Sequence, residues 1–271
     1  MIDKLYKFGQ RIPNPIAKFG AGVIVKINQL RGNNHFRYNY QGSEFVYVYY
    51  DVPTFLKQYD CIDVERGCTG LEGIPLSYFD LSDHDAAFDV GAHFGLYTVI
   101  LGKLNPDIPI FAFEPNQYNR SVLERNSKVN DFDSSRVSIS DTIIAGETGS
   151  VTFHEDRSTS GSPRDTITPG QDMEKFTDSV KREGRALSDI FTSKNIKRPF
   201  IKIDIEGAEN KVIADLLSAD LEHFAGIVEI HSSRLENGEN AVLDQFDNHN
   251  ISYDLVKDHP VKPQGYYFKS R

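Results

Sequence analysis

The sequence predicts an α/β fold in which helices cover both faces of one mainly parallel β-sheet. Three observations support this prediction. Apolar strand-like runs alternate with helical segments from residue 86 onward, residues 1–85 lack this alternation, and the last two apolar runs read as an antiparallel hairpin. Strands that alternate with helices pair in parallel, because each helix returns the chain to the same edge of the sheet. We therefore expect an N-terminal extension, residues 1–85, followed by an α/β domain, residues 86–271.

The N-terminal extension is expected to contain short helices and one β-hairpin. Residues 1–32 read as one or two short helices, because Pro13 and Pro15 interrupt any longer one. Residues 36–50 are rich in Tyr, Phe and Val, and they alternate around a Gln-Gly-Ser turn. Such a pattern favours a hairpin.

In the α/β domain we expect five parallel strands, each an apolar run bounded by turn residues. They are Ala86–Val90, Ile108–Phe113, Val137–Ile144, Phe200–Ile205 and Gly226–Ile230. The helices expected with them are Tyr97–Leu104, Asn119–Val129, Ala208–Leu217 and Asn240–His249. An extra strand is expected at Ser150–His154, and the C-terminal hairpin at Ile251–Val256 and Tyr266–Lys269. Residues 155–180 read as a long loop, and loops of that length in compact domains are usually functional or mobile.

The first strand of this domain ends in a glycine-spaced turn, Gly91-Ala-His-Phe-Gly95. Glycine lets the backbone approach a ligand closely, and the helix that follows offers N–H groups and a positive dipole end. The spacing differs from the G-x-G-x-x-G of dinucleotide-binding proteins, and the preceding Asp89 carboxylate would repel a pyrophosphate. A cationic nucleoside cofactor fits this turn, and S-adenosylmethionine is the one we expect.

A second carboxylate follows one strand–helix–strand unit later. Glu114 directly follows the apolar run Ile108–Phe113 and precedes a Pro-Asn breaker. An acid at the end of the second strand can accept hydrogen bonds from both ribose hydroxyls of a nucleoside. The alternative is that Asp89 and Glu114 only end strands and cap helices. We expect the nucleoside-binding role, because both acids accompany the glycine turn.

The segment Lys202-Ile-Asp-Ile-Glu-Gly-Ala-Glu209 places charges where a buried strand is expected. Interior parallel strands are usually apolar throughout, so Lys202, Asp204 and Glu206 on one face require an explanation. At the carboxyl end of the strand these side chains would point to the ligand crevice. Glu209 would lie near the N-terminus of the next helix, where negative charge is favourable. The alternative is a structural Lys–Asp pair followed by a helix cap.

Glu229 and His231 repeat this arrangement at the end of the fifth strand, where they share one face. Histidine is the side chain best suited to general-base catalysis near neutral pH. We expect His231 to be the base, with Asp204 and Glu206 as the other catalytic residues. A divalent cation held by Asp204, Glu206 and Glu229 is the alternative, and no metal is assigned.

These motifs resemble those of the FkbM-type S-adenosylmethionine-dependent methyltransferases. Asp89–Gly95 and Lys202–Glu209 resemble the paired motifs of the family, and Phe113–Asn116 resembles its acidic motif. Leu187–Ile190 resembles its short leucine–aspartate segment, and the resemblance extends over residues 86–232. It implies a Rossmann-like methyltransferase fold and methyl transfer to the oxygen of a sugar or natural product.

The resemblance also implies roles for individual residues. The cofactor-binding residues would be Asp89, Gly91, Gly95, Glu114, Asn116 and Asp141, the last one near the adenine amine. The residues at the reacting end would be Asp204, Glu206, Glu209, Glu229 and His231. His93 stands where the motif more often has Asn. Residues 1–85 and 155–185 lie outside the family motifs and are expected to shape the acceptor site.

We therefore expect an S-adenosylmethionine-dependent O-methyltransferase that acts on a hydroxyl group of a sugar, a glycan or a natural product. Catalysis would consist of holding the reactants in line and removing the hydroxyl proton. An NAD-dependent oxidoreductase and a non-catalytic Rossmann-like binding protein are the two alternatives. The missing dinucleotide motif argues against the first, and the acids that end four strands argue against the second.

The distribution of charge bears on partners and location. A net charge of −9 argues against nucleic acid as the main partner. Residues 1–40 are basic, which indicates either a solvated tail or a peripheral contact with an anionic membrane surface. No apolar window is long enough to span a membrane, and the N-terminus has no signal-peptide core. We expect a cytoplasmic protein that can lie at the inner membrane surface and act on a glycolipid sugar.

Overall fold

The computed structural model divides into two compact units, Met1–Glu72 and Gly73–Arg271. The residues it describes are 35–40, 43–48, 70–71, 74–155, 165–167, 178–257 and 263–271. The second unit begins before residue 86 and so includes β4 (Ile74–Pro75) and the short helix η2 (Leu76–Phe79). Phe79 is completely buried and packs edge-on against Tyr97 and Phe200, which explains why this segment belongs to the α/β unit.

The first unit contains the predicted hairpin. β1 (His35–Tyr40) and β2 (Ser43–Val48) pair in antiparallel fashion, with His35 opposite Val48. The two-residue strand β3 (Gly70–Leu71) lies at the end of this unit. The helices expected within residues 1–32 lie outside the described residues.

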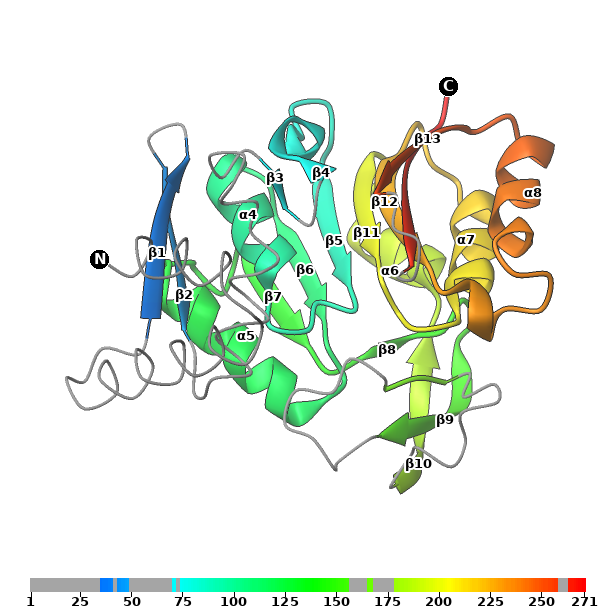
Figure 1. Ribbon diagram of the computed structural model, residues 1–271, viewed down its shortest axis with the longest axis horizontal. Coiled ribbons are helices and arrows are strands. Elements are labelled where there is room, and N and C mark those ends of the chain that lie inside the picture. The colour runs from blue at the N-terminus through cyan, green and yellow to red at the C-terminus, as the bar shows by residue number, and fades with distance from the viewer. Residues whose placement is uncertain are drawn as a thin grey trace, which may run out of the picture. The chain divides into compact units, whose positions relative to one another are not determined.

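The second unit is built on a seven-stranded sheet in the order β13-β14-β12-β11-β5-β6-β7 (Figure 1). Its strands are β5 (Ala86–Val90), β6 (Ile110–Phe113), β7 (Val137–Ser140), β11 (Pro199–Ile203), β12 (Ala225–Ile230), β13 (Ser252–Lys257) and β14 (Gln264–Lys269). Neighbouring strands in the series β12-β11-β5-β6-β7 pair in parallel, and β14 is antiparallel to both β12 and β13. The mainly parallel sheet and the C-terminal antiparallel hairpin are therefore confirmed.

Helices cover both faces of this sheet. They are α4 (Leu96–Leu104), α5 (Gln117–Val129), α6 (Leu187–Lys194), α7 (Glu209–Ser218) and α8 (Asn240–Asn248), with the short helix η4 (Ser232–Arg234) after β12. Successive residues of β5 identify the two faces. Phe88 packs edge-on against Phe191 of α6, whereas Asp89 accepts a hydrogen bond from Thr98 of α4. Each face of β5 is therefore closed by a different helix layer.

The predicted third strand is interrupted, which the sequence did not indicate. β7 ends at Ser140, where the Ser140 hydroxyl oxygen accepts the Thr142 N–H and turns the chain out of the sheet. The next strand, β8 (Ile143–Ile144), joins a separate sheet in the order β8-β10-β9. The other strands of this sheet are β10 (Asp178–Arg185), which pairs with β8, and β9 (Gly149–Glu155), the predicted extra strand, which pairs with β10.

β10 and α6 were not expected from the sequence. β10 is mostly charged and exposed, so it lacks the apolar alternation that marks a strand. α6 has only eight residues, and its N-terminal N–H groups are bound from a distance by Asp215 of α7, which lies 2.6 Å from the Leu187 nitrogen. A cap that comes from another helix leaves no local signal in the sequence.

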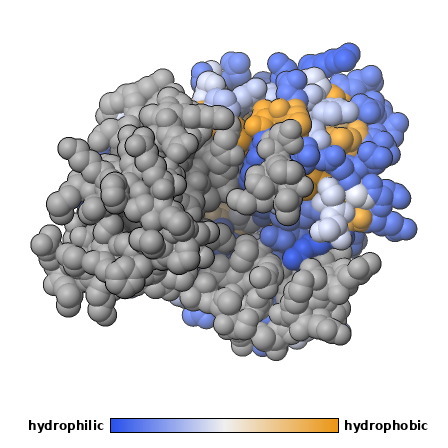
Figure 2. Space-filling view, in the orientation of Figure 1, coloured by the Kyte–Doolittle hydropathy of each residue, from blue (hydrophilic) through white to orange (hydrophobic). Residues whose placement is uncertain are grey.

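No helix among the described residues is both long and apolar enough to cross a membrane. Where described residues are visible in Figure 2, hydrophilic side chains predominate, with smaller hydrophobic areas between them.

Candidate functional site

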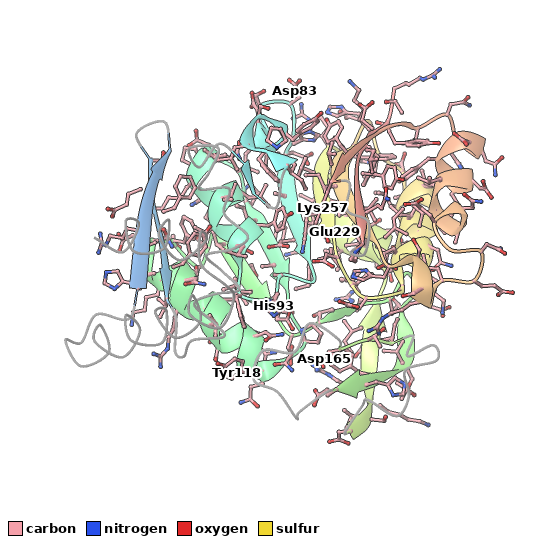
Figure 3. All side chains as sticks on the ribbon, viewed as in Figure 1. Asp83, His93, Tyr118, Asp165, Glu229 and Lys257 are labelled. Carbon is pink, nitrogen blue, oxygen red and sulfur yellow. The ribbon has the colours of Figure 1, made fainter. Side chains whose placement is uncertain are left out.

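The predicted site lies at the carboxyl edge of the sheet, where the strand order reverses. The chain proceeds from β5 to β6 and β7 on one side and from β11 to β12 on the other. Open α/β sheets form a ligand crevice at such a point. Gly91 directly follows β5 and Asp204 directly follows β11, and the Asp204 N–H donates to the Val90 carbonyl at 3.0 Å. In Figure 3, His93, Tyr118 and Asp165 lie close together on this side, and Asp83 lies at the opposite end of the unit.

The glycine turn after β5 depends on both of its glycines. Gly91 and Gly95 have φ angles of 76° and 81°, a region that favours glycine. A Cβ atom on Gly91 would lie 1.8 Å from the Asp204 carbonyl oxygen, and one on Gly95 would lie 2.3 Å from Leu123. The turn therefore packs against the residue that follows β11, and it joins the two halves of the site.

Asp89 lies beneath this turn and is completely buried. Its two oxygens face protein groups, because Thr98 Oγ1 donates at 2.6 Å and Lys202 Nζ lies 3.5 Å away. Lys202 also donates to the Gly91 carbonyl at 2.9 Å and lies 3.5 Å from Asp204. Its ammonium group is 4.9 Å from the centre of the Tyr97 ring. A buried cation thus ties the turn to the acids after β11, and Asp89 supports that cation.

Glu114 directly follows β6 and is prepared to accept hydrogen bonds. Its oxygens accept the backbone N–H groups of His93 at 2.7 Å and of Asn116 at 2.9 Å. Burial raises the pKa of Glu114 from 4.5 to about 7, although these two hydrogen bonds lower it; the nearby charge of Asp165 also raises it. Since a carboxylate has about four lone-pair sites, Glu114 retains acceptor capacity beyond the two backbone bonds.

Asn116 and Asp141 lie in the loops that follow β6 and β7. The Asn116 side chain caps α5 by accepting the Tyr118 and Asn119 N–H groups, and it donates to Asp165 at 2.6 Å. Asp141 is more than half exposed and pairs with Arg182 of β10 at 3.2 Å. The Asn116 side chain therefore binds α5 and Asp165, whereas the Asp141 side chain is largely exposed to solvent.

Asp204 and Glu206 lie beyond β11 rather than on it, which corrects the predicted strand Phe200–Ile205. β11 ends at Ile203, and Glu206 and Gly207 have positive φ angles of 58° and 109°. The chain turns at these two residues, because only five residues separate the end of β11 from the start of α7 at Glu209. Asp204, Glu206 and Glu209 nevertheless gather, since all three reach His231.

His231 is held by carboxylates on both ring nitrogens. Nδ1 lies 2.6 Å from Glu209, and Nε2 lies 3.3 Å from Glu206 and 3.7 Å from Asp204. Burial lowers the pKa of His231, but the hydrogen bonds with Glu206 and Glu209 and the charge of Asp204 outweigh it and raise the pKa to about 11. His231 is thus an imidazolium at neutral pH, which is not the protonation state that a general base requires.

Glu229 pairs with a cation rather than completing a cluster of acids. Lys257 of β13 lies 2.8 Å from it, both side chains are largely buried, and Figure 3 shows them side by side. Glu206 likewise pairs with Arg234 of η4 at 3.3 Å. In the part of the chain that the structure describes, no group of three or more His, Cys, Asp or Glu side chains is arranged to hold a metal ion.

Two contributors to this site were not predicted from the sequence. Arg234 follows His231 by three residues, a spacing that places two side chains on one face of a helical turn and could have been noticed. Thr166 donates from its hydroxyl to the Glu206 carbonyl at 2.6 Å, and no sequence pattern marks it. It lies within residues 155–180, the long loop for which a functional role was expected.

The sequence matches one known protein family over most of the α/β unit. Residues 89–253 match the model of the methyltransferase FkbM domain. This range begins at Asp89 and includes the glycine turn, Glu114, the acids after β11 and His231. No curated protein matches the sequence.

Several of the solved structures to which this chain is similar are methyltransferases. They include an FkbM methyltransferase from Methylobacillus flagellatus (16% identity, TM-score 0.45, 70% of this chain and 47% of that one). A putative SAM-dependent methyltransferase from Streptococcus mutans has 10% identity and a TM-score of 0.45, over 88% of this chain and 56% of that one. A precorrin-6y C5,15-methyltransferase from Geobacter metallireducens has 12% identity and a TM-score of 0.40, over 72% and 85%. The chain thus spans about half the length of the first of these proteins.

Proposed function

The chain belongs to the FkbM methyltransferase family, and on that premise we propose that it transfers a methyl group from S-adenosylmethionine to an acceptor hydroxyl. The observation that carries the proposal is the position of Glu114. Its buried carboxylate is held by a backbone N–H of the glycine turn, next to the point where the strand order reverses. An acid in that position suits a ribose diol.

The residues around the crevice suit S-adenosylmethionine in kind. Glu114 would accept the ribose hydroxyls, and the exposed Asp141 would accept the adenine amine. Gly91 and Gly95 would let the turn approach the cofactor, while Asp89 would act through Lys202 because it is completely buried. When bound, the cofactor supplies a methyl group activated by a positively charged sulfur.

The revised assignment of the catalytic groups follows from charge and exposure. Asp204 is the most exposed carboxylate around His231, with 29% of its side chain accessible, compared with 18% for Glu206 and none for Glu209. We assign the removal of the hydroxyl proton to Asp204. The imidazolium of His231, together with Arg234, would hold Glu206 and Asp204 in place. His231 then orients the acids instead of acting as the base.

The acceptor that we propose is a sugar hydroxyl, on a glycan, a glycolipid or a natural product. The family resemblance supports an oxygen acceptor, and the polar residues of the long loop suit a hydroxyl-rich molecule. The basic residues 1–40 support a peripheral contact with an anionic membrane, where each nearby Lys or Arg contributes about 1 kcal/mol. Flotation with anionic and neutral liposomes tests this contact. Binding to neither kind at low salt would leave a soluble acceptor.

A thermal-shift series tests the function itself. S-adenosylmethionine and S-adenosylhomocysteine should raise the melting temperature, and NAD should not, because only a ligand of the folded state stabilises it. Stabilisation by NAD alone would instead favour an oxidoreductase. Mass spectrometry of glycans from a deletion strain then tests the acceptor. The expected result is a sugar lighter by one methylene group, and unchanged glycans would contradict a glycan acceptor.

Variants of the acids separate catalysis from binding. Removing a general base typically lowers the rate by about 10²–10⁴-fold, so Asp204→Asn should reduce kcat strongly and leave cofactor affinity almost unchanged. Asp141→Asn is the matched control, since it should alter affinity rather than kcat. Each assay is repeated with a chelator. Loss of activity on chelation, with full activity in Asp204→Asn, would replace this mechanism with a metal-assisted one.

A further inference from the structure

We propose that residues 165–167 form a strap that connects the nucleoside half of the site to the acids at its reacting end. This inference rests on the proposed function. The strap lies between β9 and β10, outside the motifs of the glycine turn and of the acids after β11. It is attached to both halves of the site by side chains of neighbouring residues.

One end of the strap is attached beside Glu114. Asp165 accepts a hydrogen bond from the Asn116 side chain at 2.6 Å, and Asn116 also donates its backbone N–H to Glu114. The charge of Asp165 acts on Glu114 as well. A ligand that binds Glu114 therefore changes the surroundings of Asp165.

The other end of the strap is attached to the backbone of Glu206. Thr166 is almost completely buried, and its hydroxyl donates to the Glu206 carbonyl at 2.6 Å. Its backbone forms a two-bond bridge with His154 of β9, with N–O distances of 2.8 and 3.1 Å. Thr166 is thus fixed by β9 and can hold Glu206 at a defined place.

The peptide unit between Glu206 and Gly207 is held from two sides. Its carbonyl oxygen accepts from Thr166, and its N–H donates to the Glu209 carboxylate at 3.0 Å. The same Glu209 oxygen lies 2.6 Å from His231 Nδ1. Glu206 has a left-handed backbone, which is unfavourable for a residue with a side chain unless the surroundings impose it. We infer that the Thr166 hydroxyl imposes it and so directs the Glu206 side chain toward His231 and Arg234.

The consequence is a coupling between nucleoside binding and the reacting end. Binding at Glu114 would fix Asp165, the adjacent Thr166 would be held more firmly, and the Glu206–Gly207 peptide would lose freedom. Thr166 is therefore a positioning residue, which acts through Glu206 and touches neither reactant. Such coupling requires a group whose state both sites influence, and the peptide plane is that group.

Hydrogen exchange of the Gly207 amide measures this coupling directly. The probe is 5′-deoxy-5′-methylthioadenosine, which carries the nucleoside but lacks the amino-acid chain that would reach the acids itself. In the wild type, the probe should slow exchange both near His93 and at Gly207. In Thr166→Val, the Gly207 amide should exchange about two- to tenfold faster, as expected for the loss of one neutral hydrogen bond. The probe should then slow exchange near His93 only.

Two control variants accompany Thr166→Val. Thr166→Ser keeps the hydroxyl and should behave as the wild type. Thr142→Val removes a hydroxyl that bonds to the Ser140 hydroxyl rather than to Glu206, and it should leave the response of Gly207 intact. If Thr166→Val does not fold, Asp165→Ala cuts the other end of the strap and should likewise abolish the response at Gly207.

The outcomes distinguish the strap from the proposed function. If the wild type binds S-adenosylhomocysteine and the probe, but Gly207 does not respond, the strap is overturned and the function stands. The same holds if Thr166→Val responds as the wild type does. If the wild type binds neither compound, the proposed function fails, and the strap fails with it.

Discussion

At the scale of single residues, the site is governed by how buried charges are compensated. Lys202 lies between Asp89 and Asp204, and His231 lies among three carboxylates. Breaking a buried ion pair leaves an unpaired charge, which is strongly destabilising. Burial raises the pKa of Glu114, and the surrounding carboxylates raise that of His231, so each residue gives a prediction that depends on pH.

We predict that affinity for S-adenosylhomocysteine rises with pH around neutrality. The ionised form of Glu114 is the stronger acceptor for ribose hydroxyls, and its pKa is raised to about 7. Between pH 6 and 8 the ionised fraction, and hence the affinity, should rise by about tenfold. Calorimetric titration at several pH values measures this. Glu114→Gln should bind about tenfold to a few hundredfold more weakly, because a charged hydrogen bond is lost, and without this pH dependence.

Glu124→Gln provides a matched control, since this acid is exposed on α5 and its change should leave both affinity and pH dependence unaltered.

The stability of the free protein should fall as the pH rises, whereas the affinity for S-adenosylhomocysteine should rise. The folded state retains a proton on Glu114 that the unfolded chain loses above pH 4.5. This contribution to stability is therefore largest below pH 4.5 and falls as the pH rises through about 7. Equal affinity for wild type and Glu114→Gln would remove Glu114 from the site.

We predict that His231 stabilises the fold at neutral pH and loses this effect in alkali. Its pKa is raised from 6.5 to about 11, so the folded state keeps a proton that the unfolded chain releases. The contribution is complete below pH 6.5 and falls as the pH rises toward about 11, with a slope of at most about 1.4 kcal/mol per pH unit. Urea unfolding at pH 7, 8 and 9 compares the wild type with His231→Gln and with His249→Gln, an exposed control. Parallel curves for all three proteins would show that His231 carries no such charge.

At the scale of elements, close contacts between segments decide which turns are allowed. The turn after β5 lies against the carbonyl of Asp204, and Asp215 of α7 holds the first N–H groups of α6. In both cases one segment fixes the backbone of another that is distant in sequence. A substitution in either segment therefore affects both.

We predict that Gly91→Ala is severely destabilising and that Gly149→Ala is almost neutral. At Gly91 a Cβ atom would lie 1.8 Å from a backbone oxygen and φ is 76°, whereas a Cβ atom on Gly149 would have no atom beyond its chain neighbours within 4 Å. Backbone strain of this kind costs about 1–3 kcal/mol, and the clash adds to it. Melting temperatures of the two variants decide the point. A Gly91→Ala variant as stable as the wild type would contradict the close packing of the turn.

At the scale of the whole molecule, the α/β unit carries the proposed activity and begins before the first motif. Ile74, Leu76, Phe79 and Leu81 are almost completely buried although they precede β5. Burial of one such side chain contributes about 1.5–3 kcal/mol, so this short segment is important for the stability of the sheet. A fragment that begins at the boundary predicted from the sequence, between residues 85 and 86, would lack this short segment.

We predict that a fragment of residues 73–271 folds and binds S-adenosylhomocysteine, whereas residues 86–271 are much less stable. The difference should be several kcal/mol, because four apolar side chains lose their burial and Phe79 leaves a cavity beside Tyr97 and Phe200. Circular dichroism during urea unfolding measures both fragments. Equal stability would support the boundary at residue 86, and failure of both to fold would show that residues 1–72 are required.

The sequence by itself determined the type of fold and predicted where a nucleoside cofactor would bind. Apolar runs of the right length predicted β5, β6, β11 and β12, since the interior strands of a parallel sheet are apolar regardless of their neighbours. The glycine turn and Glu114 were likewise predicted, because their chemistry is local to the ends of β5 and β6. The family motifs rest on the same residues.

Only the tertiary structure decided how the acids behave and which distant residues reach them. The sequence predicted His231 as a base, whereas in the folded protein carboxylates from one loop and a helix surround it and raise its pKa to about 11. The sequence did not predict β10 and α6, because the groups that stabilise them lie elsewhere in the chain. β10 pairs with β8 and β9, and Asp215 binds the first N–H group of α6. Thr166 reaches Glu206 across 40 residues. Electric fields and hydrogen bonds depend on distance in space, which a local pattern in the sequence does not contain.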